Sequence, residues 1–179
     1  MKNQPNLRNL CLSAMFLALA FVLPFLTGQV PQIGGMLCPM HIPALLCGFI
    51  CGGPWGAVVG FVAPLLRSFI LGAPSLFPKA VAMAFELAAY GFFSGILYRS
   101  FPKKKMYIYL SLVLSMIGGR LIWGAVQFIC MGLGASEFSL SMFWAGAVAN
   151  AIPGIVIQLL LIPLLVMLVE KTERSSGKI

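Results

Sequence analysis

Long apolar runs, separated by short polar segments, dominate the chain. Stretches such as LCLSAMFLALAFVLPFL and AIPGIVIQLLLIPLLVMLV carry apolar residues in succession. They lack the alternation of apolar and polar residues that is typical of membrane β-barrel strands. Helices and closed barrels are the only structures that cross a bilayer with every backbone polar group satisfied, so the pattern predicts α-helices.

The pattern predicts six helices, at residues 9–26, 40–52, 55–71, 79–98, 106–133 and 142–169. A helix that crosses the hydrocarbon core needs about 20 residues. The second helix is shorter than this, but six spans place both basic termini on the same side. We therefore predict an all-α polytopic membrane protein, a bundle of six transmembrane helices that forms one integral-membrane domain over residues 1–179.

Small residues recur at a spacing of four within the predicted helices. The pairs are Ala14 and Ala18, Gly48 and Gly52, Gly56 and Gly60, and Gly91 and Gly95. Small residues let helix backbones approach closely in lipid, where apolar side chains gain little from meeting one another. For the glycine pairs we expect packing inside the bundle.

Composition and charge agree with a membrane protein. Hydrophobic residues make up 60% of the chain and charged residues 9%, whereas soluble domains are roughly 25% charged. The net charge is +8, but the basic residues lie in short clusters between apolar runs, so we do not expect nucleic-acid binding. Nine of them precede the first helix, lie between the fourth and fifth, or follow the sixth: Lys2, Arg8, Arg99, Lys103, Lys104, Lys105, Lys171, Arg174 and Lys178. The positive-inside rule then predicts that both termini are cytoplasmic.

Four charged residues fall at one depth in the outer half of the membrane: Arg67, Lys79, Glu86 and Arg120. A charge at the bilayer centre costs between about 2.5 and 17 kcal/mol, depending on the method. We therefore expect these side chains to face one another or a watery cleft that is open to the exterior. One interpretation is a buried ion-pair network, for example Glu86 with Arg67 or Arg120. The other is a ligand pocket, in which the surplus of cations suits an acidic group.

Polar and aromatic residues at a similar depth complete the candidate binding site. Along the fourth helix, Glu86 and Tyr90 share a face, and along the fifth helix Arg120 and Trp123 do so. The candidate substrate-binding residues are Arg67, Lys79, Glu86, Tyr90, Arg120, Trp123, Gln127, Trp144, Asn150 and His41.

The sequence lacks the motifs of common catalytic and nucleotide sites. There is no G-x-x-x-x-G-K-[ST] loop to hold ATP, no H-E-x-x-H, no G-x-S-x-G and no aspartate. We expect neither an enzyme nor a metal ion or organic cofactor. Besides a binding subunit, two other functions stay open: a self-sufficient small transporter or channel that works as a homo-oligomer, and a structural subunit without a ligand.

The chain resembles the substrate-binding S components of energy-coupling factor (ECF) vitamin transporters. The shared features are the length, six helices, cytoplasmic termini, a long first outer loop, the A-x-x-x-A of the first helix (AMFLA, Ala14 to Ala18) and the stretch from Met40 to Arg99. Since A-x-x-x-A is common in membrane helices, it is the combination that carries the resemblance.

The resemblance implies a mechanism and partners. An S component in the bacterial plasma membrane binds a micronutrient from outside, in a pocket built from the first outer loop and helices four to six. It then associates with a transmembrane coupling protein and two ATPase subunits. The resemblance assigns Ala14 and Ala18 to the docking surface for the coupling protein. An acidic vitamin, such as pantothenate or niacin, suits the three cations, and a cationic or amphoteric ligand stays open if Glu86 is not ion-paired.

Overall fold

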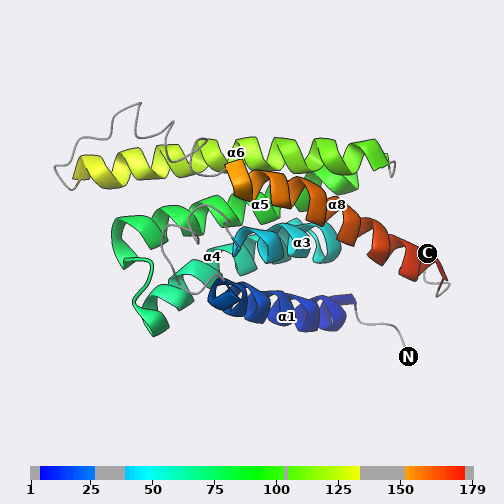
Figure 1. The fold of residues 1–179 in the computed structure, drawn as a ribbon, viewed down its shortest axis with the longest axis horizontal. Coiled ribbons are helices and arrows are strands. Elements are labelled where there is room, and N and C mark those ends of the chain that lie inside the picture. The colour runs from blue at the N-terminus through cyan, green and yellow to red at the C-terminus, as the bar shows by residue number, and fades with distance from the viewer. Residues whose placement is uncertain (1–4, 27–38, 103–104, 134–151, 176–179) are drawn as a thin grey trace.

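The computed structural model describes residues 5–26, 39–102, 105–133 and 152–175. The helices are α1 (Pro5–Leu26), α3 (His41–Cys51), α4 (Gly53–Leu71), α5 (Val81–Ser100), α6 (Lys105–Leu133) and α8 (Ile152–Ser175). A short segment, η1 (Leu76–Ala80), precedes α5 and contains extended backbone at Phe77. The described chain contains no strand, which confirms the all-α prediction (Figure 1).

The predicted helices correspond closely to the observed ones. The short second helix is confirmed as α3, whose 11 residues rise only about 16 Å at 1.5 Å per residue. The fourth helix begins at Val81, so Lys79 lies in η1 before it. The sixth predicted helix corresponds to α8 from Ile152 onward, and its predicted residues 142–151 lie outside the described residues.

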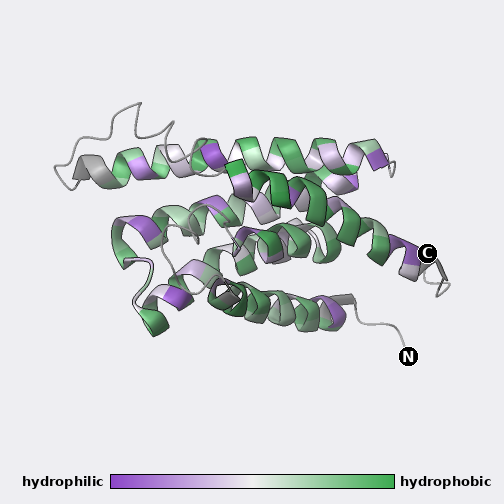
Figure 2. Cartoon of the chain, in the orientation of Figure 1, coloured by the Kyte–Doolittle hydropathy of each residue, from purple (hydrophilic) through white to green (hydrophobic). Residues whose placement is uncertain are grey.

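The exterior of the bundle is apolar. Figure 2 shows that apolar residues predominate along most of the helices. Large apolar side chains such as Leu121, Phe128 and Leu160 are exposed. Within the described ranges, five helices are long and apolar enough to cross a membrane, and α3 is a shorter apolar helix. Exposed apolar surface on this scale needs lipid around it.

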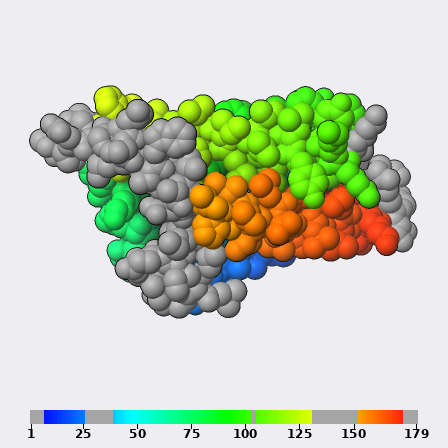
Figure 3. Space-filling model, turned by 45° about the horizontal axis from the view of Figure 1, so that its top comes forward, coloured from blue at the N-terminus to red at the C-terminus, as the bar shows by residue number. Residues whose placement is uncertain are grey.

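Helix α5 lies at the centre of the packing and contacts α3, α4 and α6. Helix α1 packs on α3 and α4, on one side of the bundle, and α8 packs on α3 and α6. Figure 3 shows α6 and α8 side by side along one face. The consequence for the site is that side chains from α3, α5 and α6 can meet in the interior.

Glycines allow α3, α4 and α5 to approach one another at backbone distance. A Cβ atom added to Gly56 of α4 would lie 2.7 Å from the Gly48 Cα of α3 and 2.7 Å from the Gly91 carbonyl oxygen of α5. Real Cβ atoms do not approach other atoms so closely. The predicted packing role of the glycine pairs is therefore confirmed here, because no larger residue fits at the crossing.

One end of the bundle, here called the basic end, is tied together by polar contacts. The Asn9 amide and the Arg99 guanidinium both donate to the Cys51 carbonyl, at 3.4 and 3.1 Å. The Tyr98 hydroxyl donates to the Glu170 carboxylate. These contacts join the start of α1 to the ends of α3, α5 and α8. The first residues of α1 and the last of α8 therefore lie at the same end, as Figure 1 shows.

We predict that Gly56→Val destabilises the bundle by about 1–3 kcal/mol, the usual cost of overpacking, because the branched side chain pushes α4 away from α3 and α5. Thermal unfolding of the protein in detergent or nanodiscs measures the effect. Ala125→Val is the control, since Ala125 is an exposed position on α6. Equal melting temperatures for the two variants would contradict the close crossing.

Candidate functional site

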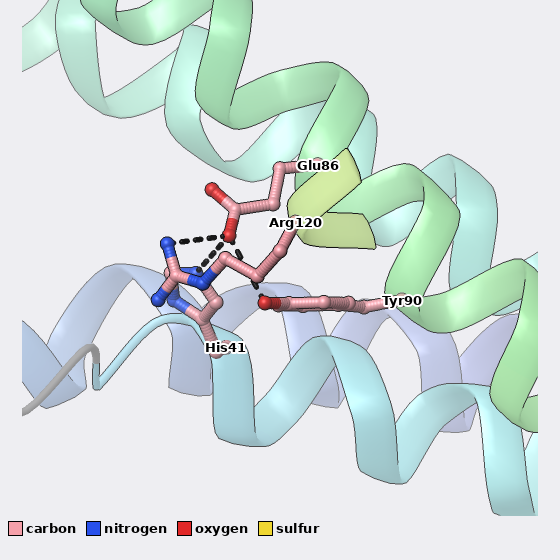
Figure 4. A network of polar contacts seen from close by, with 4 residues as sticks. All are labelled: His41, Glu86, Tyr90 and Arg120. Atoms are coloured by element: carbon pink, nitrogen blue, oxygen red, sulfur yellow. Dashed lines mark hydrogen bonds and ion pairs between the residues drawn. The ribbon is translucent and has the colours of Figure 1, made fainter. Parts of the chain in front are cut away.

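Glu86 is the centre of a buried polar cluster at the end of the bundle opposite the basic end, here called the site end. Its side chain is 2% exposed. Three groups converge on one carboxylate oxygen, Oε1, as Figure 4 shows. Arg120 Nη1 of α6 lies 2.9 Å away as an ion pair, and the Tyr90 hydroxyl donates a hydrogen bond at 3.0 Å. The third group is His41, at the start of α3.

His41 approaches the same oxygen without a hydrogen bond. Its Nε2 lies 3.4 Å from Glu86 Oε1, which is within ion-pair range but not aligned for hydrogen bonding. The imidazole ring lies against Tyr90, with 5.3 Å between the ring centroids. The ring is buried, and neither of its nitrogens makes a hydrogen bond in the described part of the chain.

Local sequence explains how α5 and α6 bring these groups together. Glu86 and Tyr90 are four residues apart, so they lie on the same face of α5. Gly119 precedes Arg120 on α6, and a Cβ atom at Gly119 would overlap the Tyr90 ring and lie 3.2 Å from the Glu86 carbonyl oxygen. Because Gly119 has no side chain, α6 approaches α5 closely enough for Arg120 to reach the carboxylate.

The ion pair makes a buried charge tolerable at this position. A carboxylate in a low-dielectric interior needs a charged or hydrogen-bonding partner. Removing one partner of a buried ion pair costs about 3–5 kcal/mol, because the other charge is left uncompensated. The sequence analysis allowed either Arg67 or Arg120 as the ion-pair partner of Glu86. In the structure the partner is Arg120.

Arg67 lies near the end of α4, and its side chain points towards α1 and not towards Glu86. Its side chain is buried, its Nη1 donates to the Phe21 carbonyl at 3.3 Å, and its guanidinium lies 5.4 Å from the centre of the Phe25 ring. Within the described ranges no carboxylate pairs with Arg67. Among the residues that the structure describes, Arg67 is therefore separate from the Glu86 cluster and is a buried cation without a counter-charge.

The other candidate residues are placed as follows. Lys79 is exposed and makes no contact with the cluster among the residues described. Gln127 is buried one turn beyond the half-buried Trp123 on α6. Trp144 and Asn150 lie outside the described residues.

Two buried polar side chains deeper in the bundle were not singled out from the sequence. Gln158 of α8 is 2% exposed, and its Oε1 has no hydrogen-bond partner in the described structure. Ser111 of α6 is fully buried, and its hydroxyl is likewise unsatisfied. A lone polar residue inside a long apolar run is the signal that could have identified Gln158, because such residues usually face the bundle interior.

Comparison with known proteins adds an independent finding. The comparisons with curated proteins and with solved structures gave no significant match. The model of the family described as ECF transporter, substrate-specific component, matches residues 8–166, which is most of the chain. This confirms the resemblance seen in the sequence and agrees with the apolar helices that can cross a membrane. The chain therefore belongs to the family of ECF transporter substrate-specific components, as a multi-pass membrane subunit of an importer.

Proposed function

We propose that this subunit binds a water-soluble micronutrient with an acidic group at the site end and delivers it inward with a separate ATPase-driven module. The partners in this proposal are a transmembrane coupling protein and two ATPase subunits, and the location is the bacterial plasma membrane. The function is transport, with no catalytic step and no bound cofactor. The family match supports the role, and the charges at the site end support the ligand class.

The main observation that supports an acidic ligand is a surplus of buried positive charge at the site end. Among the described residues at the site end, Arg67 and Glu86 are buried and Arg120 is 16% exposed. Glu86 neutralises Arg120, so no carboxylate in the described ranges balances the charge of Arg67. An unmatched cation in a low-dielectric region favours an anionic ligand, and a guanidinium matches the geometry of a carboxylate.

The apolar packing joins the helix segments that carry Arg67 and Glu86. Ala63 of α4 and Leu87 of α5 belong to one buried apolar cluster, together with Ala20 and Ala44. Arg67 lies one turn beyond Ala63, and Glu86 adjoins Leu87 in the chain. In this proposal the ligand lies at the site end, with its acidic group towards Arg67 of α4 and its remainder towards the polar cluster around Glu86 of α5.

The distribution of basic residues supports an orientation in which both termini face the cytoplasm. Arg8, Arg99, Lys105 and Lys171 lie at or near the basic end, which the positive-inside rule assigns to the cytoplasm. Glu86 lies 13 residues before Arg99 along α5, a rise of about 20 Å. The site end then opens to the exterior, as uptake requires.

Helix α1 supports the proposed docking to the coupling protein. Ala14 and Ala18 are both exposed on α1, whereas Phe16 and Ala20 are buried against the bundle. Small exposed residues at a spacing of four allow the backbone of a partner helix to approach closely. Docking on this face leaves the site end unobstructed.

The decisive experiment identifies the small molecule that stays with the purified protein. Native mass spectrometry of the protein in detergent, followed by release and identification of the bound compound, should reveal an acidic micronutrient. Co-purification of ATPase subunits supports the importer. Uptake by the isolated chain in liposomes without ATP would instead favour the self-sufficient transporter.

We predict that Arg67→Gln weakens binding of the acidic compound by about 10- to 100-fold, the loss expected for a hydrogen bond to a charged group. Lys79→Gln is the matched control, because it removes the same charge from an exposed residue at the same end. Binding of the radiolabelled compound measures both. If Arg67 serves only to hold α1, affinity stays at the wild-type value while the melting temperature falls.

We also predict that Ala14→Trp and Ala18→Trp abolish ATP-driven uptake while ligand affinity stays within the error of the wild type, because the indole separates the partner helix from α1. Leu19→Trp is the control, since Leu19 is also exposed on α1 but points about 100° away from Ala18 and about 140° away from Ala14. Uptake by cells that express the whole complex provides the measurement. Loss of ligand binding in the alanine variants would mean that this face of α1 packs inward.

A further inference from the structure

His41 is a third donor group beside a carboxylate oxygen that already has two. Glu86 Oε1 lies 2.9 Å from Arg120 Nη1 and accepts a hydrogen bond from the Tyr90 hydroxyl at 3.0 Å. A carboxylate oxygen has two lone pairs, so these two contacts occupy it. His41 Nε2 lies 3.4 Å from the same oxygen and makes no hydrogen bond with it. The imidazole is therefore in place beside the carboxylate but is excluded from it.

This exclusion leaves His41 unsatisfied. Its side chain is 3% exposed, and neither ring nitrogen has a hydrogen-bond partner in the described part of the chain. A buried polar group without a partner keeps its full desolvation penalty. An N–H···O hydrogen bond is about 2.9 Å long, so Nε2 needs to approach Oε1 by only about 0.5 Å to form one. It can do so once one of the present donors leaves.

Arg120 is the donor that is able to leave. Its side chain is 16% exposed, whereas Glu86 is 2% and Tyr90 1% exposed. The Tyr90 ring lies against Gly119 of α6, where an added Cβ atom would overlap it, so the phenol is held in place. Arg120 has a long side chain with five N–H donors. A ligand that enters from the site end therefore meets Arg120 before the buried members of the cluster.

We propose that Glu86 exchanges partners when the substrate binds. Arg120 turns to an acceptor oxygen or nitrogen of the substrate, and His41 Nε2–H donates to Glu86 Oε1 in its place. Removing one partner of a buried ion pair is costly because the other charge is left uncompensated, and the imidazole prevents this. His41 is thus a positioning residue. The inference rests on the proposed function and adds a requirement to its substrate class: an acceptor atom besides the acidic group that lies towards Arg67.

Arg120→Met tests the exchange without a ligand, because methionine is long and unbranched but has no donor. His41 is the only histidine of the chain, so the NMR signals of 15N-labelled histidine belong to it. The protein is the full chain in nanodiscs. We expect Arg120→Met to show a downfield, hydrogen-bonded proton on Nε2 that the wild type lacks. Adding Glu86→Leu to this variant should remove the signal.

Lys79→Met is the matched control, because it removes a cation that is exposed and makes no contact with the cluster among the residues described. Its histidine spectrum should equal that of the wild type. A wild-type histidine spectrum in folded Arg120→Met overturns the inference. The proposed function then stands if Arg67→Gln still weakens binding of the acid.

Stability gives a second measurement. His41→Phe keeps a ring against Tyr90, which lies 5.3 Å away between centroids, but has no nitrogen to replace Arg120. Arg120→Met should therefore lower the melting temperature more in the His41→Phe protein than in the wild type, since residues of one polar network are not additive. Equal decreases overturn the exchange. So does failure of Arg120→Met to fold with His41 present, because the imidazole should then support Glu86.

Two acids serve as probes of the ligand step, pantothenate and nicotinate, because each has an acceptor atom besides its carboxylate. When either is bound at saturation, the wild-type spectrum should show the same downfield proton on His41 Nε2. Binding without this signal overturns the inference and leaves an acid-binding function standing. Binding of neither compound counts against both the inference and the acidic ligand class.

Discussion

The constraint on which this structure depends is that hydrocarbon cannot solvate a charge. The chain places Glu86 about 20 Å from the basic end, in the interior of an apolar bundle, with 2% of its side chain exposed. The carboxylate persists there because a guanidinium and a phenol, from α6 and α5, both reach one of its oxygens. The position and rotation of these helices are therefore tied to the satisfaction of a single charged group.

Close helix packing makes this arrangement possible. Gly48, Gly56 and Gly91 bring α3, α4 and α5 to backbone contact, and Gly119 brings α6 against Tyr90. Larger residues at these positions would separate the helices and move Arg120 and His41 out of reach of the carboxylate. In a membrane, where apolar side chains gain little by associating, such close backbone contact is a main source of helix–helix affinity. The same glycines that hold the bundle together thus build the polar cluster.

The two ends of the bundle differ in how their polar groups are satisfied. At the basic end, Asn9 and Arg99 share one carbonyl and Tyr98 bonds to Glu170, so helix ends are joined to one another. At the site end, buried polar atoms remain unsatisfied and Arg67 has no counter-charge among the described residues. This difference fits the proposal that a substrate binds at the site end. Arg67 also links the site end to α1, because its guanidinium contacts Phe21 and Phe25.

The sequence by itself determined which segments form helices and that these helices are apolar enough for a membrane. Run length and hydropathy predicted the helices, including the short α3, and the spacing of glycines predicted where backbones meet, because these properties depend on neighbours along one chain segment. Residue counts alone predicted a shared depth for Arg67, Glu86 and Arg120, and this stays a prediction. Residue counts did not predict which arginine pairs with Glu86. Arg67 lies on the same face of α4 as Gly60 and Ala63, but its guanidinium reaches α1. Arg120 is the residue that reaches Glu86. Only the tertiary structure decided that Arg120 pairs with Glu86 and that His41 approaches the same carboxylate. The reason is that spacing along a helix sets the depth and angle of a side chain but not which neighbouring helix it meets.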